Sequence, residues 1–180
     1  EWRVVSEGVA QRIRALEAFL ADVYDRGDIM RDGVVPKSLV TSSSHYHRQA
    51  HGIVPANGVR IHVAGVDLVR DEQGTFHVLE DNLRCPSGVS YVLENRRTLA
   101  HVVPEVFTGY RVSPVTEYPE RLYRALAAAA PRDVHDPTVV VLTPGVYNSA
   151  HFEHAFLARR MGAELVEGRD LFCRGGFVYM

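Results

Sequence analysis

The fold of this chain is decided by residues 78–88, which read Val78-Leu79-Glu80-Asp81-Asn82-Leu83-Arg84-Cys85-Pro86-Ser87-Gly88. Apolar residues recur at every second position over residues 59–68 and again over residues 76–79, which is typical of strands. The polar segment between them, Arg70 to Gly74, has the composition of a turn. The sequence therefore predicts an antiparallel hairpin that leads into a loop containing proline and glycine.

Two carboxylates and an amide lie on the predicted hairpin: Asp67 on its first strand, and Glu80 and Asn82 at the end of its second. Residues two apart on a strand point to the same side, so we expect Glu80 and Asn82 to converge and Asp81 to point away. Strand pairing can bring Asp67 beside them. Such an all-oxygen set suits Mg²⁺. The alternative is a solvated hairpin face with ordinary charges.

The remaining segments predict an α/β protein. Helices are expected over residues 6–25, with Ser6 as N-cap, and over residues 90–101 and 119–130. Residues 138–142 resemble a strand buried on both faces; a helix over 150–161 and a strand over 164–166 follow. This order predicts a parallel β-α-β unit after the hairpin-containing part.

The composition is that of an ordinary globular chain, with 180 residues, 46% of them hydrophobic and 23% charged. The net charge of −2 argues against a nucleic-acid or membrane-surface partner, and the short apolar runs argue against a membrane span. The two cysteines, Cys85 and Cys173, favour a reducing cytoplasm. Of the 20 Lys and Arg residues only Lys37 is a lysine, and both chain ends suggest a piece of a longer protein.

Several strings together resemble one protein family. They are residues 78–96, beginning Val78-Leu79-Glu80-Asp81-Asn82, the string Leu142-Thr143-Pro144-Gly145-Val146-Tyr147-Asn148-Ser149, Phe152-Glu153-His154, and residues 165–171. An Asp followed thirteen positions later by Glu-x-Asn and then a Pro-x-Gly loop is similar to the magnesium-binding end of ATP-grasp ligases. The strings as a whole resemble the circularly permuted type 2 ATP-grasp proteins, which are relatives of glutathionylspermidine synthetase.

The resemblance implies an ATP- and Mg²⁺-dependent ligase that joins a small-molecule carboxylate to an amine through an acyl phosphate. It implies that Asp67, Glu80 and Asn82 hold Mg²⁺ and that Arg84 binds the γ-phosphate or the acyl phosphate. For Arg84 a surface ion pair is the alternative. Ser87 and Gly88 would offer backbone N–H groups to an anion at the start of the following helix.

A second group of candidates follows the strand expected at 138–142: Gly145, Tyr147, Asn148 and Ser149. Ligands favour this edge of an open sheet, so these residues are candidates for a substrate pocket, with plain turn chemistry as the alternative. We expect residues 1–130 to be the metal-binding part of a permuted ATP-grasp domain and residues 138–180 to begin an α/β substrate domain. ATP-grasp sites normally hold phosphates with lysines, so this chain alone is expected to lack a competent ATP site.

Other interpretations stay open at this point. The protein could transfer phosphate to a small acceptor without ligation, or it could be a non-catalytic binding or scaffold domain that retains the fold. His45, His47 and His51 are possible metal ligands, although their loop composition favours solvated side chains. The sequence assigns neither the substrates nor an oligomeric state.

Overall fold

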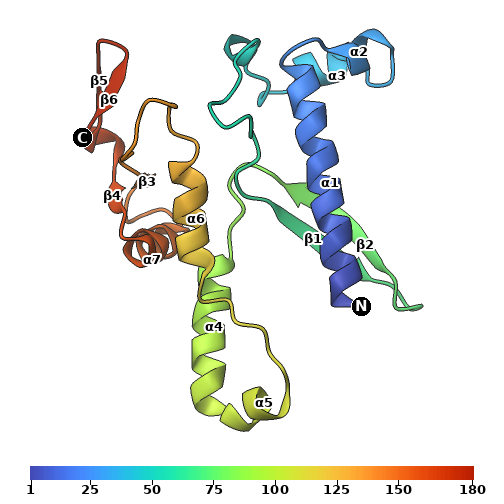
Figure 1. The fold of residues 1–180 in the computed structure, drawn as a ribbon, viewed down its shortest axis with the longest axis vertical. Helices are drawn as coiled ribbons and strands as arrows, with labels where there is room; N and C mark the ends of the chain where they lie inside the picture. The colour runs from blue at the N-terminus through green and yellow to red at the C-terminus, as the bar shows by residue number, and fades with distance from the viewer. The chain divides into compact units, whose positions relative to one another are not determined.

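The computed structural model describes residues 1–180, which divide into two compact units, Glu1–Cys85 and Pro86–Met180 (Figure 1). Helices and small sheets are mixed in the chain, and the predicted α/β class is confirmed. The division at Cys85 falls inside the predicted 1–130 domain. The domain limits predicted for the whole protein remain a prediction.

The first unit combines a long helix, three short helices and a hairpin. Its elements are α1 (Trp2–Val23), α2 (Asp28–Arg31), α3 (Lys37–Thr41), η1 (Arg48–Ala50), β1 (Gly65–Arg70) and β2 (Phe76–Asn82). The predicted N-cap is wrong: Ser6 lies inside α1, and its hydroxyl donates to the carbonyl of Arg3. Because residues 2–5 are already helical, the hydroxyl bonds back along the helix instead of capping its first turn.

The predicted hairpin is confirmed, and α1 runs along it (Figure 1). Two ion pairs join them, Arg12 with Asp81 at 2.7 Å and Glu1 with Arg70 at 2.6 Å. The first strand begins at Gly65, later than predicted. In the preceding segment the Glu17 carboxylate accepts the backbone N–H groups of residues 60 and 61, at 3.0 and 2.8 Å, so those donors bond α1 instead of a strand.

The second unit contains a helical part and a parallel strand pair. Its elements are α4 (Val89–Val102), α5 (Pro104–Gly109), α6 (Tyr118–Ala127), β3 (Val140–Leu142), α7 (His151–Met161), β4 (Glu164–Val166), η2 (Gly168–Asp170), β5 (Phe172–Arg174) and β6 (Phe177–Tyr179). Strands β3 and β4 are parallel neighbours connected through α7, as the β-α-β prediction requires. Helix α7 packs against α4 and α6. Its side chains Phe156 and Ala158 are buried with Leu93 and Val166.

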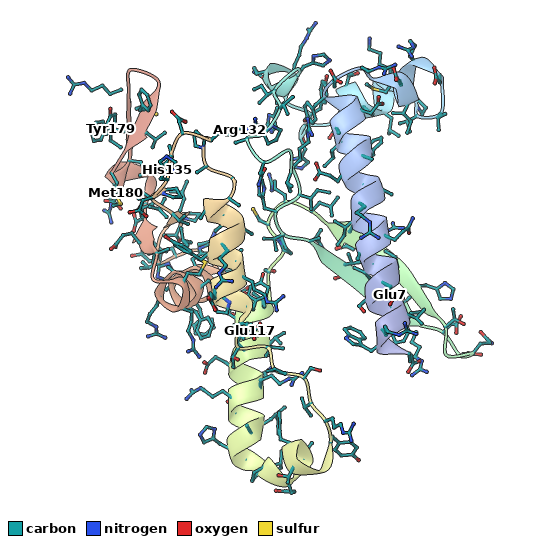
Figure 2. The ribbon with its side chains drawn as sticks, viewed as in Figure 1. Glu7, Glu117, Arg132, His135, Tyr179 and Met180 are labelled. Carbon is teal, nitrogen blue, oxygen red and sulfur yellow. The ribbon has the colours of Figure 1, made fainter.

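One prediction about strands in this unit is wrong. Strand β3 is not buried on both faces, since 59% of Leu142 is exposed; its only paired neighbour is β4. The last residues also contain a strand pair that the sequence analysis did not predict. Strands β5 and β6 form a hairpin in which Phe172 stacks on Tyr179, with ring centroids 5.3 Å apart. Tyr179 is labelled in Figure 2. No helix in the structure is long and apolar enough to cross a membrane.

Candidate metal and phosphate site

A β-bulge at Leu79 determines which side of the hairpin carries the acidic residues. Asp67 pairs with Glu80, and the next residue, Leu68, pairs with Val78, so Leu79 is the extra residue on β2. Val78 lies on the side that faces α1. Without the bulge, alternation would put Glu80 and Asn82 on that same side. The extra residue turns both of them to the opposite, solvent-exposed side.

Asp67, Glu80 and Asn82 therefore share one face of the hairpin. Asp67 and Glu80 are directly opposite each other, and the Asn82 amide nitrogen donates to a Glu80 carboxylate oxygen at 2.9 Å. All three are exposed, and the Asp67 carboxylate forms no hydrogen bond or ion pair. The Asn82 hydrogen bond uses its nitrogen and leaves the amide oxygen as an acceptor. Two carboxylates and an amide oxygen fit the ligand preference of Mg²⁺, which retains several waters of its own.

The structure contains no group of three or more His, Cys, Asp or Glu side chains arranged to hold a metal ion. The hairpin set has only two carboxylates, so it would need Asn82 and further ligands supplied by waters or phosphate oxygens. His45, His47 and His51 do not form such a group either. Metal binding at Asp67, Glu80 and Asn82 remains a prediction.

Asp81 points to the other side of β2, as predicted. Its carboxylate accepts three short contacts from the Arg12 guanidinium, at 2.8, 3.0 and 2.7 Å. This hydrogen-bonded pair lowers the pKa of Asp81. The pair attaches the metal-candidate end of the hairpin to the middle of α1, which limits how far Glu80 and Asn82 can shift on either side of it.

The predicted phosphate-binding residues fall in the connection between β2 and α4. Arg84 and Ser87 are exposed, and the Arg84 guanidinium forms no hydrogen bond or ion pair. Gly88, at φ 104°, is the N-cap of α4. Its N–H already has a partner: both oxygens of the Glu153 carboxylate accept it, at 2.9 and 2.7 Å. A phosphate could use this N–H only by displacing Glu153.

Glu153 is a functional candidate that the sequence analysis missed. It lies on α7 with 6% of its surface exposed, and it also accepts a short hydrogen bond from the hydroxyl of Ser90, which is fully buried. Burial and the charge of Glu153 together raise the pKa of Tyr118. A glutamate on the core side of a helix with buried aromatic neighbours is the signal that could have indicated a partner. The position of that partner, more than sixty residues earlier, could not be deduced.

The predicted substrate residues lie in the connection from β3 to α7. Gly145 is buried at φ 105°, and a Cβ there would lie 3.4 Å from the Glu167 carboxylate. Asn148 accepts the N–H of Ala150 at 2.9 Å, which shapes the start of α7, while Tyr147 and Ser149 are exposed. Asn148 therefore has a turn role.

The neighbouring polar contact is between Thr143 and His154. Thr143 is buried, its hydroxyl oxygen lies 2.9 Å from His154 Nδ1, and it accepts the N–H of Gly145 at 3.2 Å. This contact ties the end of β3 to α7, and its hydroxyl fixes the turn at Gly145. The sequence offered no signal for it beyond the polar composition of the turn.

Comparison with known proteins identifies relatives over the full chain. An uncharacterized protein of Mycobacterium tuberculosis (strain ATCC 25618 / H37Rv) is 63% identical over all 180 residues, which are 33% of its own length. An uncharacterized protein of Synechocystis is 51% identical over 180 residues, 37% of its length. A Frankia casuarinae protein named "Putative glutamate--cysteine ligase 2-2" is 42% identical over 172 residues, 95% of this chain and 20% of that protein.

The chain thus spans about a third of the length of the first two relatives. The family described as "A circularly permuted ATPgrasp" matches residues 1–180, from before α1 to the last residue after β6. The β1–β2 hairpin, the loop Pro86-Ser87-Gly88 and the β3-α7-β4 unit all lie inside this match. On this match the chain belongs to the circularly permuted ATP-grasp family.

Proposed function

We propose that the whole protein is an ATP- and Mg²⁺-dependent ligase that joins a small-molecule carboxylate to an amine. Family membership supports ATP use, and the Frankia relative named "Putative glutamate--cysteine ligase 2-2" supports a ligase reaction. The observation that carries the proposal is the shared face of Asp67, Glu80 and Asn82, created by the bulge at Leu79. A glutathionylspermidine synthetase-like reaction is the finer form of this proposal.

In the proposed reaction a substrate carboxylate oxygen attacks the γ-phosphorus of ATP and ADP leaves. The amine then attacks the carbonyl carbon of the acyl phosphate, so that inorganic phosphate and a proton leave and an amide forms. Bound Mg²⁺ would neutralise charge on the transferring phosphoryl group. Asp67, Glu80 and Asn82 would hold that metal through their oxygens, and Arg84, which has no partner in this structure, would bind the phosphoryl or acyl-phosphate anion.

At the start of α4, in the second unit, Ser87 would offer its N–H to a phosphate-like anion, and Gly88 would do so after Glu153 releases it. In the second unit, the turn that contains Gly145, Tyr147, Asn148 and Ser149 would contact a substrate at the carboxyl end of β3. Small molecules are thus the proposed partners of both units.

The test is calorimetric titration of ATP with excess Mg²⁺ into the whole protein and its Glu80→Gln and Asp67→Asn variants. We expect each variant to weaken Mg²⁺-dependent nucleotide binding at least tenfold, because a neutral amide replaces a charged ligand. The matched control is Glu72→Gln, an exposed glutamate in the turn of the same hairpin, which should bind as the unaltered protein does.

Unchanged binding in both Asp67→Asn and Glu80→Gln would show that the metal assignment is wrong. If the unaltered protein bound no Mg²⁺-ATP at all, the ligase proposal would fail and a scaffold role would be favoured. If it bound and consumed ATP but phosphorylated an acceptor without forming an amide, the phosphotransferase alternative would hold.

A further inference from the structure

A hollow of about 890 Å³ in the first unit collects cationic side chains that the proposed metal site does not use. It lies beside the C-terminal end of α1 and includes the only lysine of the chain. Its lining residues are Val23, Arg26, Gly27, Met30, Arg31, Lys37, Thr41, Tyr46, Arg48 and His51. Four of these are permanent cations, and none is a carboxylate. We call it the cationic hollow.

The backbone around the cationic hollow is held by specific contacts. Tyr24 stacks on Tyr46 with ring centroids 5.4 Å apart, its hydroxyl accepts the N–H of His47 at 3.2 Å, and its carbonyl accepts the N–H of Gly52 at 2.7 Å. These contacts fix the histidine-rich segment against the end of α1. Its Arg48 and His51 are thereby brought to the same hollow as residues from α2 and α3.

The other side of the hollow is fixed by Asp22. Its carboxylate accepts the N–H groups of Asp28 and Ile29, both at 2.9 Å, and so caps α2. These two hydrogen bonds lower the pKa of Asp22, and the bond from the Ile29 N–H has the larger effect. Gly27, in the left-handed conformation, joins α1 to α2, and a Cβ there would lie 3.1 Å from the Met30 methyl carbon. The backbone of this wall is therefore set independently of any bound molecule.

The charges around the hollow are only partly neutralised. Arg26 and Arg31 both pair with Asp28, at 3.0 and 2.8 Å. Lys37 and Arg48, by contrast, form no ion pair. Lys37 and Arg48 are exposed cations on one concave surface, and neither has an acidic partner that offsets its charge. A ligand with several negative charges could pair with both.

The hollow is separate from the candidate metal site. Asp81 contacts α1 at Arg12, whereas the hollow begins at Val23, eleven residues further along the helix. At 1.5 Å per residue this is about 16 Å. Asp67, Glu80 and Asn82 also lie on the side of the hairpin that faces away from α1. A small ligand in the hollow would not touch them.

We propose that the cationic hollow binds a small polyanion, a molecule with two or more carboxylate or phosphate groups, through Lys37 and Arg48. Lys37 supplies a compact ammonium, and the Arg48 guanidinium can form paired hydrogen bonds to a carboxylate or phosphate. This polyanion is a ligand separate from the nucleotide at the hairpin, so its binding does not depend on the proposed function.

The test uses the whole protein in EDTA at low salt, so that no metal at the hairpin contributes to binding. Citrate and tripolyphosphate are titrated separately by calorimetry. We expect saturable binding of one anion per chain by at least one of them, weakened about tenfold in Lys37→Met and in Arg48→Ala. Arg48→Lys should restore part of the loss because it restores the charge. The preferred probe tells whether carboxylate or phosphate is the recognised group.

Arg14→Ala is the matched control, since Arg14 is an exposed arginine of α1 outside the hollow. An equal loss in Arg14→Ala, unchanged binding in both hollow variants, or no saturable binding of either probe would overturn the proposal. Circular dichroism of each variant confirms that it is folded. Mg²⁺-ATP binding by Lys37→Met is measured in parallel and should be unchanged, which separates failure of the hollow from failure of the metal site.

Discussion

The buried carboxylate of Glu153 is the contact whose removal the structure predicts most sharply. In Glu153→Ala the half-buried N–H of Gly88 and the buried hydroxyl of Ser90 lose their acceptor. An unsatisfied buried donor costs about 1–3 kcal/mol, and the half-buried N–H of Gly88 adds about 1 kcal/mol because water can reach it in part. We therefore expect Glu153→Ala to lower the free energy of unfolding by about 3 kcal/mol.

Glu153→Gln separates the charge from the shape. The amide oxygen can still accept the Gly88 N–H, and the Ser90 hydroxyl can rotate to accept from the amide nitrogen. Two hydrogen bonds to a charged group become ordinary ones, and we expect a loss of about 1–2 kcal/mol. Stability should therefore increase from Glu153→Ala to Glu153→Gln to the unaltered protein. This order is expected of a carboxylate that accepts hydrogen bonds from two donors.

Urea unfolding followed by circular dichroism measures these differences, and hydrogen exchange at the first amides of α4 locates them. Ser90→Ala tests the assignment, because removing one donor should make the further change Glu153→Ala less costly by about 1–2 kcal/mol. The control is Glu164→Gln, an exposed glutamate in the same unit, expected within about 0.5 kcal/mol of the unaltered protein. A Glu153→Ala variant as stable as this control would refute the reasoning.

Two further predictions concern the contacts that hold each unit together. Arg12 holds the pKa of Asp81 below its usual value, so this carboxylate stabilises the fold above about pH 3.9 and loses that contribution as the pH falls through its lowered pKa. In Arg12→Gln the thermal midpoint should therefore fall less steeply below pH 4, as scanning calorimetry against pH would show, and a steeper fall would contradict the assignment. Phe156, 4% exposed, fills the centre of the second unit, and Phe156→Ala should cost about 3–5 kcal/mol in urea unfolding; a loss under 1 kcal/mol would show that this side chain is not the core residue the structure makes it.

The parts of the fold that the sequence predicted are those governed by local periodicity. The hairpin of β1 and β2 and the helix between β3 and β4 follow from alternating and helical spacing of apolar residues. The hairpin at the C-terminus was missed even though Gly175 and Gly176 supply the two positive φ angles that a tight turn needs.

The parts that could not be predicted depend on contacts between distant residues. Glu17 bonds the backbone of residues 60 and 61, which ends the expected strand early, and nothing near those residues indicates it. Glu153 binds Gly88 across a comparable gap in sequence. The bulge at Leu79 also has no local signal, because leucine suits a regular strand equally well.

The bulge at Leu79 affects which sequence changes this strand can accept during evolution. Val78 is half-buried on one side of β2 and Glu80 is exposed on the other, so the extra residue lets the two positions vary independently. Deleting one residue here would leave Glu80 and Asn82 in the sequence but turn their side chains to the opposite face of the hairpin. We therefore expect substitutions of Leu79 to be tolerated far more readily than an insertion or deletion beside it. In related proteins the length of this strand should vary less than the identity of its bulged residue.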